Sequence, residues 1–346
     1  MTGSKKLSFT SDYMEGAHPA ILRRLAETNM AKTAGYGLDE YSEAARDKVR
    51  RACCAPDAEV FFLAGGTQAN AVMTGALLRP YQGVISAQTG HINGHEAGAI
   101  EAGGHKVLAL PHRNGKVSAE DVRGLIEGYL KDENRDHIVM PGMVYTSQPT
   151  EYGTLYSLEE LSALSGVCRS CGMPLYMDGA RLAYALACPE NDVSLPDIAR
   201  LCDAFYIGGT KCGALFGEAV VIPKRGFIPH LFTMIKQHGA LLAKGRISAL
   251  QFDALFTDGL YLEIGRTAIA AADRIRACLA DKGYELAIDS PTNQIFVILD
   301  SKQAERLLEK LDLGFWENLP DGRTVYRIAT SWATQDEDIN SLLAVL

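Results

Sequence analysis

The stretch "YMDGARLAYAL", residues 176–186, places two opposite charges at the point where an apolar run ends. Asp178 directly follows "PLYM", and Arg181 comes three residues later with two small residues between them. A second stretch, "FYIGGTKCGALFG" (205–217), places Lys211 in a glycine-rich loop between two apolar runs. Because ligands of open α/β sheets bind beyond the carboxyl ends of the strands, charges at these positions indicate a functional edge.

Seven short apolar runs, each bounded by Gly, Pro or Asn, predict the strands of one large sheet. They span residues 59–65, 83–87, 105–110, 137–147, 173–178, 204–209 and 218–223. Several are almost continuously apolar, which is typical of strands buried on both faces of a parallel sheet. Most spacers read as helices: Ser118–Asp121 and Ser157–Glu160 form capping-box pairs, and Thr67 is a candidate N-cap. The alternation predicts a doubly wound α/β domain with a mostly parallel seven-stranded sheet under helices.

The pattern changes after about residue 223. A long helix over 259–283 is followed by two strands, a helix over 301–312, the strand "TVYRIATSW" and a last helix. This β-β-α-β-α order predicts a small α+β domain. We therefore expect an N-terminal segment (1–40) that packs on the domains, a large domain (41–255) and a small C-terminal domain (256–346).

Composition narrows the classes of partner. The 346 residues carry a formal net charge of −8, whereas nucleic-acid binding requires a basic face. No apolar stretch reaches the ~18 residues that a membrane helix needs, and the N-terminus lacks the apolar core of a signal peptide. The eight cysteines are expected as reduced thiols in the cytoplasm, and Cys168 and Cys171 lack a second ligand pair for a metal.

Polar residues follow five of the predicted strands. They are Gly65-Gly66-Thr67, His91 with His95, Ser147-Gln148, Asp178 with Arg181, and Thr210-Lys211. Taken singly, each has a plain alternative: a glycine turn with a Thr cap, a surface loop lysine, or an (i, i+3) ion pair.

Together these residues predict a pyridoxal 5′-phosphate (PLP) site. Backbone N–H groups at a helix start hold phosphate, a lysine in an apolar pocket attacks carbonyls, and a carboxylate pairs with a pyridine nitrogen. A nicotinamide-dinucleotide site is excluded because no G-x-G-x-x-G fingerprint is present.

The chain resembles the threonine aldolase and β-eliminating lyase family of fold-type I PLP-dependent enzymes. The resemblance covers nearly the whole chain in order. It runs through "FTSDYMEGAHPAI", "GYGLDEY", "FFLAGGTQAN", "GHINGHEAGAI", "YMDGAR", "GGTKCGALFGEAVVI" and "VYRIATSW". The "DGAR" with a downstream lysine is the most specific of these motifs.

The resemblance implies a role for each matching residue. Lys211 would form the internal aldimine, Asp178 would contact the pyridine nitrogen, and His91 would stack on the ring and transfer protons. The phosphate and its surroundings would involve Gly65, Gly66, Thr67, Thr210 and Arg181. Ser11, Arg181 and Arg327 would bind the substrate carboxylate.

The implied reaction is aldol cleavage of an L-β-hydroxy-α-amino acid, of the threonine or allo-threonine type, to glycine and an aldehyde. His91 is the first candidate for the base that removes the β-hydroxyl proton, and His95 or Glu96 the second. The chain departs from the family pattern at Thr210, at "YTSQPTEYG" and at "HINGHE", so a wider pocket for a phenylserine-like substrate is expected. β-Elimination or transamination on the same scaffold remains the alternative, with a non-catalytic protein of this fold as the third.

Fold-type I enzymes commonly build each active site from two subunits, so the resemblance implies a homodimer or homotetramer. The N-terminal segment and "LLAKGRISALQF" (241–252) would lie near the neighbour. Arg246 would either reach the partner's cofactor phosphate or stay on the helix surface.

Overall fold

A seven-stranded sheet forms the larger part of the computed structural model, which describes residues 6–346. The strand order is β2-β8-β7-β6-β5-β3-β4, and β8 alone runs in the direction opposite to the other six strands. The strands are β2 (Glu59–Leu63), β3 (Gln82–Ala87), β4 (Val107–Leu110), β5 (Met140–Ser147), β6 (Leu175–Asp178), β7 (Ala204–Gly208) and β8 (Glu218–Ile222). Each corresponds to one predicted apolar run, so the prediction of a mostly parallel seven-stranded sheet is confirmed.

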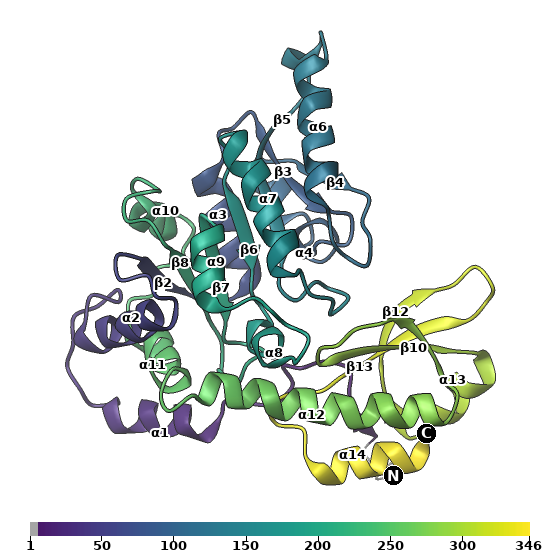
Figure 1. Ribbon diagram of the computed structural model, residues 1–346. Coiled ribbons are helices and arrows are strands. Elements are labelled where there is room, and N and C mark those ends of the chain that lie inside the picture. Colours follow the sequence, from purple (N-terminus) through teal and green to yellow (C-terminus); the bar gives the residue numbers. More distant parts are fainter. Residues whose placement is uncertain (1–5) are drawn as a thin grey trace.

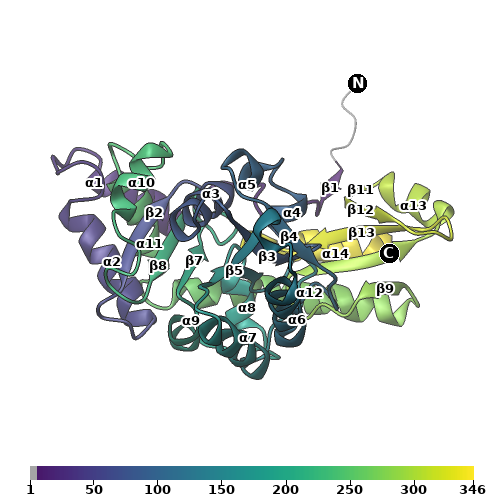
Figure 2. The same ribbon diagram turned by 90° about the horizontal axis from the view of Figure 1, so that it is seen from above.

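Helices cover both faces of this sheet. Seen from above, α3 and α10 lie on one side of it, and α6, α7 and α9 lie on the other (Figure 2). The described helices that precede residue 256 are α1 (Pro19–Thr28), α2 (Glu40–Ala52), α3 (Gly66–Leu77), α4 (His91–Gly94), α5 (Ala99–Ala102), α6 (Ala119–Lys131), the 3₁₀ turn Arg135–His137, α7 (Leu158–Ser170), α8 (Leu182–Ala187), α9 (Leu195–Leu201), α10 (Leu231–Gln237) and α11 (Arg246–Leu255).

Successive strand residues alternate between two apolar cores. Phe205 belongs to one cluster of buried side chains and its neighbour Tyr206 to the other, and Met177 and Tyr176 alternate in the same way. Side chains of a strand point to opposite faces in turn, so both faces of these strands are covered. This explains the continuous apolar character of the strands in the sequence.

Two of the predicted helix starts are confirmed and one is wrong. Ser118 and Ser157 each form a reciprocal capping box with the acidic residue three positions later. Helix α3 instead begins at Gly66, with Gly65 as its N-cap and no side-chain cap. Thr67 lies inside the first turn, so the N–H groups at this helix start have no side-chain cap.

The C-terminal part contains a second, antiparallel sheet of order β12-β13-β10-β9. It contains β9 (Glu285–Ile288), β10 (Gln294–Leu299), β12 (Gly314–Asn318) and β13 (Thr324–Ala329), with α12 (Leu260–Asp281), α13 (Ser301–Leu308) and α14 (Asp336–Val345). The predicted β-β-α-β-α order did not include β12. This strand lies at the edge of the sheet, and its Phe315 is 61% exposed, so its apolar pattern is weak. The predicted order also missed the short β11 (Leu311–Asp312), which pairs in parallel with β1 (Leu7–Ser8).

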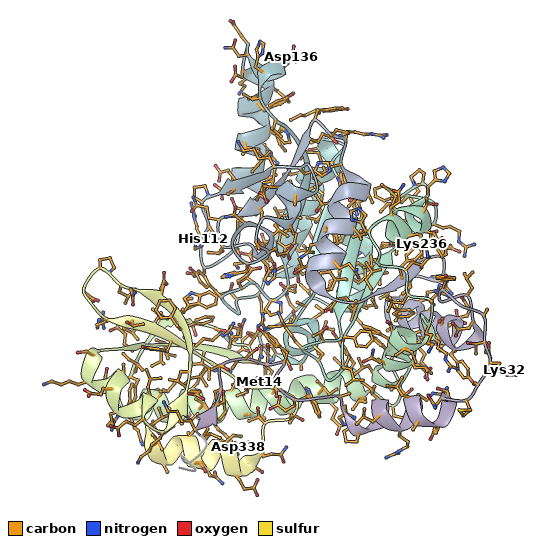
Figure 3. All side chains as sticks on the ribbon, turned by 180° about the vertical axis from the view of Figure 1, so that it is seen from behind. Met14, Lys32, His112, Asp136, Lys236 and Asp338 are labelled. Atoms are coloured by element: carbon orange, nitrogen blue, oxygen red, sulfur yellow. The ribbon has the colours of Figure 1, made fainter. Side chains whose placement is uncertain are left out.

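Helix α12 connects the two parts, running from below the large sheet to below the C-terminal sheet (Figure 1). The opposite view shows Asp136, after α6, at one extremity and Asp338 of α14 at the other (Figure 3). Residues 1–5 of the expected N-terminal segment lie outside the described residues. The division at residues 40 and 255 stays a prediction.

Within residues 6–346, no helix is long and apolar enough to cross a membrane. The same residues contain no cluster of His, Cys, Asp and Glu with metal-binding geometry. All eight cysteines are free thiols, and the second cysteine of the C-x-x-C pair, Cys171, caps the end of α7.

Candidate active site

One cavity of about 390 Å³ lies at the carboxyl edge of the large sheet. It is lined by every residue predicted to bind the cofactor: Gly65, Gly66, Thr67, His91, Asp178, Arg181, Thr210 and Lys211. These residues follow four different strands, β2, β3, β6 and β7. The parallel topology brings them together because the carboxyl ends of these strands meet at one edge.

Asp178 is the last residue of β6 and is buried at the base of this cavity. Its Oδ2 accepts hydrogen bonds from the Tyr145 hydroxyl (2.7 Å) and from Asn70 Nδ2 (3.1 Å), and its Oδ1 accepts from the Ala180 N–H (3.0 Å). Burial raises the pKa of Asp178, but the charge of His91 and hydrogen bonds including that from Tyr145 outweigh it, so the pKa is lowered. The carboxylate is therefore kept ionised and fixed in direction.

Lys211 occupies the loop after β7 and lines the same cavity. Burial, joined by the positive charge of Arg181, lowers the pKa of Lys211, while Asp12 and Asp178 oppose the shift. A lysine with a lowered pKa holds a larger share of neutral amine, the form that attacks carbonyls. The loop lysine is thus half-buried against the cavity rather than a freely exposed surface side chain.

His91 begins α4 and is oriented by Glu96, one of the residues named as a second candidate base. His91 Nδ1 lies 2.8 Å from Glu96 Oε1, and Asn70 Nδ2 donates to the same oxygen at 2.7 Å. Asn70 Nδ2 also donates to Asp178, so the side-chain amide of Asn70 links Glu96, the partner of His91, to Asp178. The Glu96 side chain is completely buried, so it orients His91 instead of reaching a ligand.

His95, the other second candidate, lines the cavity of Lys211 and also a neighbouring cavity of about 560 Å³. Burial lowers the pKa of His95, and the nearby charges of His91 and Arg327 act in the same direction. The ring is therefore kept neutral. Its neighbour Trp316, with ring centroids 6.1 Å apart, belongs to an aromatic wall that Tyr152 and Phe315 extend.

Arg181 and Arg327 both line this second cavity. Arg181 is held by Asp12, which accepts from its Nε at 2.6 Å and from its Nη2 at 3.1 Å. The opposite charges of "DGAR" therefore do not pair with each other. Arg327 donates to Gln294 Oε1 and to the Thr10 carbonyl, while its buried Nε has no partner among the described residues.

Three other residues that were candidates from the sequence, Ser11, Gln148 and Arg246, do not line either cavity. Ser11 is buried, its hydroxyl has no partner among the described residues, and Tyr13 rather than Ser11 is among the residues that line the cavities. Gln148 is buried and bonds the backbone of Tyr156. Arg246 donates to the carbonyls of Asn29 and Ala31 within its own chain.

Sequence reasoning missed three acidic residues of the site: Asp12, Glu151 and Glu218. Glu151 lines both cavities, and its Oε1 accepts from Ser147 Oγ (2.7 Å) and from the His91 N–H (3.0 Å). Burial raises the pKa of Glu151, although the hydrogen bond from Ser147 opposes the rise. The only feature of the sequence that could have indicated them is their position, because Glu151 and Glu218 lie near strand ends and Asp12 lies in the N-terminal segment.

Comparisons with known proteins agree with this geometry. The chain is 31% identical over 342 residues to the low-specificity L-threonine aldolase of Pseudomonas sp. (strain NCIMB 10558), covering 97% of this chain and 96% of the relative. The solved structure of Leishmania major threonine aldolase is 42% identical, covers 98% of both chains and superposes with a TM-score of 0.94.

A Thermus thermophilus aspartate aminotransferase mutant, 17% identical, covers 99% of this chain and 91% of its own with a TM-score of 0.71, and shares the fold alone. These matches confirm the expected fold-type I architecture. The model of the β-eliminating lyase family matches residues 8–311. With a full-length relative above 30% identity as well, the chain belongs to the β-eliminating lyase family.

Proposed function

We propose that this protein is a PLP-dependent aldolase that cleaves an L-β-hydroxy-α-amino acid, of the threonine or allo-threonine type, to glycine and an aldehyde. The observation that carries the proposal is the single cavity in which half-buried Lys211, buried Asp178 and the uncapped start of α3 meet. The Pseudomonas and Leishmania relatives are threonine aldolases that match nearly the full chain.

The cavity fits PLP. A Cβ on Gly65 would meet nothing within 4 Å, so open space adjoins the uncapped helix start, whereas a Cβ on Gly66 would lie 2.9 Å from the Tyr206 hydroxyl. Glycine at both positions therefore lets a phosphate approach the N–H groups of α3. Thr67 adds a hydroxyl, whereas the hydroxyl of Thr210 is donated to Glu218. Asp178 provides the anion for a pyridine nitrogen, and Lys211 provides the amine.

PLP, when bound, supplies an electrophilic aldehyde carbon and an electron-withdrawing ring that stabilises negative charge at a substrate Cα. Lys211 contributes an amine whose neutral share is increased, because burial lowers its pKa. Asp178 contributes a fixed negative charge, held by Tyr145 and Asn70. These two residues prepare the site before any substrate arrives.

The substrate carboxylate has two guanidinium groups available, one from each part of the fold. Arg181 follows β6, and Arg327 lies on β13 of the C-terminal sheet, in the predicted small domain. Asp12 holds the Nε side of Arg181, and the Nε of Arg327 has no hydrogen-bond partner within residues 6–346. The aromatic wall of Tyr152, Phe315 and Trp316 suits an apolar β-substituent, which supports phenylserine-like substrates beside threonine.

His91 is placed to accept the proton of the β-hydroxyl. When its Nδ1–H is donated to Glu96, the lone pair of the neutral ring lies on Nε2. Transfer of the hydroxyl proton to this atom allows the Cα–Cβ bond to break and the aldehyde to leave. Base catalysis of this kind contributes about 10²–10⁴-fold to the rate.

Replacing His91 by phenylalanine is expected to lower kcat for cleavage by about 10²–10⁴-fold, because the ring stays and the proton acceptor is lost. Affinity for PLP should change little. Steady-state kinetics and a cofactor titration measure the two effects separately. His238→Phe, on an exposed histidine that ends α10, is the matched control. An equal loss of kcat and of PLP affinity would show that His91 acts only by packing.

A product assay tests the proposed reaction. Purified protein supplied with PLP is given L-threonine, L-allo-threonine and L-phenylserine. Glycine and the matching aldehyde in equal amounts are expected. Ammonia and a keto acid without glycine would instead place the protein among the eliminating enzymes, the alternative that shares the same lysine and aspartate.

We propose further that the protein is a homodimer or homotetramer. A cavity of about 410 Å³ near the N-terminal helices is bordered by exposed Tyr36, Leu38 and Phe232, an apolar surface suited to a second copy. Residues 241–252 adjoin it through Leu241 and Leu242. Analytical ultracentrifugation of the PLP-loaded protein tests this, and a monomer at micromolar concentration would contradict it.

The free cysteines support the expected cytoplasmic location, because thiols stay reduced there. The substrate is proposed to be a small amino acid, with no nucleic acid or membrane as partner. Fractionation of cells that express the protein tests the location.

A further inference from the structure

Glu218 is an acidic residue that the topology places at the cofactor edge of the large sheet. It is the first residue of β8, the antiparallel strand, so it lies where the neighbouring strands end. In register it faces Leu63 of β2 on one side and Gly208 of β7 on the other. The chain after β2 continues into the start of α3, and the chain after β7 continues into Lys211.

The side-chain hydrogen bonds of Glu218 among the described residues are with the loop that carries Lys211. Its Oε1 accepts from Thr210 Oγ1 at 2.8 Å, and its Oε2 accepts from the Gly209 N–H at 3.0 Å. Thr210 Oγ1 in turn accepts from the Gly217 N–H at 3.0 Å. Glu218 is 3% exposed, lines the cavity, and forms no salt bridge with any Lys, Arg or His of residues 6–346.

The surroundings of Glu218 favour its neutral form. Burial raises the pKa of Glu218 to about 8, although the Thr210 and Gly209 hydrogen bonds and the charge of Lys211 oppose the rise. The titratable groups that face it come from β6, β7, the Lys211 loop and α12: Asp178, Tyr176, Tyr206, Lys211, Cys212 and Tyr261. Lys211 is the one cation of this set and is coupled also to Asp12 and Asp178.

The phosphate cradle proposed above offers no positive side chain. Gly65, Gly66, Thr67 and Thr210 provide N–H groups and hydroxyls only. A phosphate that entered beside an ionised Glu218 would bring two anions together in a buried cavity, which is strongly unfavourable. A protonated carboxyl at the same position donates a hydrogen bond instead.

We propose that Glu218 keeps its proton while the cofactor is bound and donates that proton in a hydrogen bond to the phosphate group. The inference rests on the proposed PLP function and adds a residue that makes phosphate binding dependent on pH. A proton taken up on binding makes affinity fall about tenfold per pH unit once the free protein loses that proton. The affinity for PLP is therefore expected to begin to fall near pH 8, and the affinity for a ligand without phosphate is expected not to show this fall.

The test compares PLP with pyridoxal, which lacks the phosphate but carries the same aldehyde. Apoprotein is titrated with each ligand between pH 7.5 and 9.5, above the second phosphate pKa of about 6. The ratio of the two dissociation constants removes the pH dependence of Lys211, because both ligands react with that amine. In the wild type, the advantage of PLP over pyridoxal is expected to fall about tenfold per unit above pH 8.

Glu218→Gln is the test variant, since its amide can still accept from the Thr210 loop and can donate to phosphate at every pH. We expect the advantage of PLP to become independent of pH in this variant. Glu151→Gln, which changes another carboxylate of the same cavity, is the matched control and should keep the slope of the wild type.

Two results would overturn the inference. If the advantage of PLP over pyridoxal in the wild type does not depend on pH, this result alone excludes proton uptake, even if Glu218→Gln does not fold. A slope unchanged in Glu218→Gln assigns the proton to another group. Failure of the proposed function is distinct: a wild type that binds neither PLP nor pyridoxal overturns the cofactor assignment and this inference with it.

Discussion

Replacing Lys211 by alanine is expected to abolish cleavage, lowering kcat/KM by at least about 10⁴-fold, the scale of loss when an enzyme nucleophile is removed. The physical reason is that this amine lines the cavity together with Asp178 and Arg181, where partial loss of solvent lowers its pKa. Glycine formation from L-threonine or L-phenylserine measures the effect. The cofactor absorbance that depends on a lysine adduct should disappear at the same time.

Lys224→Ala is the matched control for this prediction. Lys224 is also a loop lysine that follows a strand of the large sheet, β8, but it is exposed. Its replacement should leave both the rate and the absorbance unchanged. Retained glycine formation in Lys211→Ala, at more than a few per cent of the wild-type rate, would remove the lysine from the mechanism and with it the main support for the aldolase proposal.

Replacing Asp12 by alanine is expected to destabilise the protein by about 3–5 kcal/mol, the range for breaking a buried ion pair from one side. The Asp12 side chain is completely buried, and it accepts two hydrogen bonds from Arg181, whose side chain is 11% exposed. Without Asp12 the guanidinium stays buried and unpaired. The midpoint of urea unfolding measures the loss, and KM should rise because Arg181 is no longer held in place.

The effect should also depend on pH. Burial raises the pKa of Asp12, but the charge and hydrogen bonds of Arg181 outweigh it and lower the pKa from 3.8 to about 2. A lowered folded-state pKa contributes stability that is present above the unfolded value and lost as pH falls through the folded value. The difference between wild type and Asp12→Ala should therefore be full at pH 7 and narrow between pH 4 and 2.

Glu127→Ala provides the control for an exposed ion pair. Glu127 accepts from Lys131 at 3.2 Å on α6, and both side chains are more than half exposed. Such pairs contribute about 0–1 kcal/mol. Equal destabilisation by Glu127→Ala and Asp12→Ala would contradict the buried-pair explanation.

The large sheet could be predicted because its signal is local. Each strand is a short apolar run, and the two cores that receive alternate residues explain why the runs lack polar interruptions. The position of Lys211 and Asp178 directly after such runs then placed both at one edge of the sheet. The strand β12 escaped prediction because it lies at an edge with Phe315 exposed, so burial left little trace in its pattern.

The partners of the site residues could not be predicted in this way. Asp12 and Arg181 are 169 residues apart in the chain, and Asn70 and Asp178 are 108 apart. No periodicity relates residues at such separations. The separate roles expected for Asp178 and Arg181 stay a prediction, and only the fold shows that Arg181 is held by Asp12. The same holds for Glu96, which orients His91 and is too buried to act as the base itself.

By itself, the sequence determined the order of strands and helices and the kind of reactive groups at the strand ends, because burial and chain geometry impose these patterns over a few residues. The tertiary structure decided which carboxylates surround those groups. Glu218 is the clearest case: it reads as one polar residue before an apolar run. It reaches the cofactor edge only because β8 is inserted antiparallel between β2 and β7. Strand direction is set by long-range packing, which no local pattern encodes.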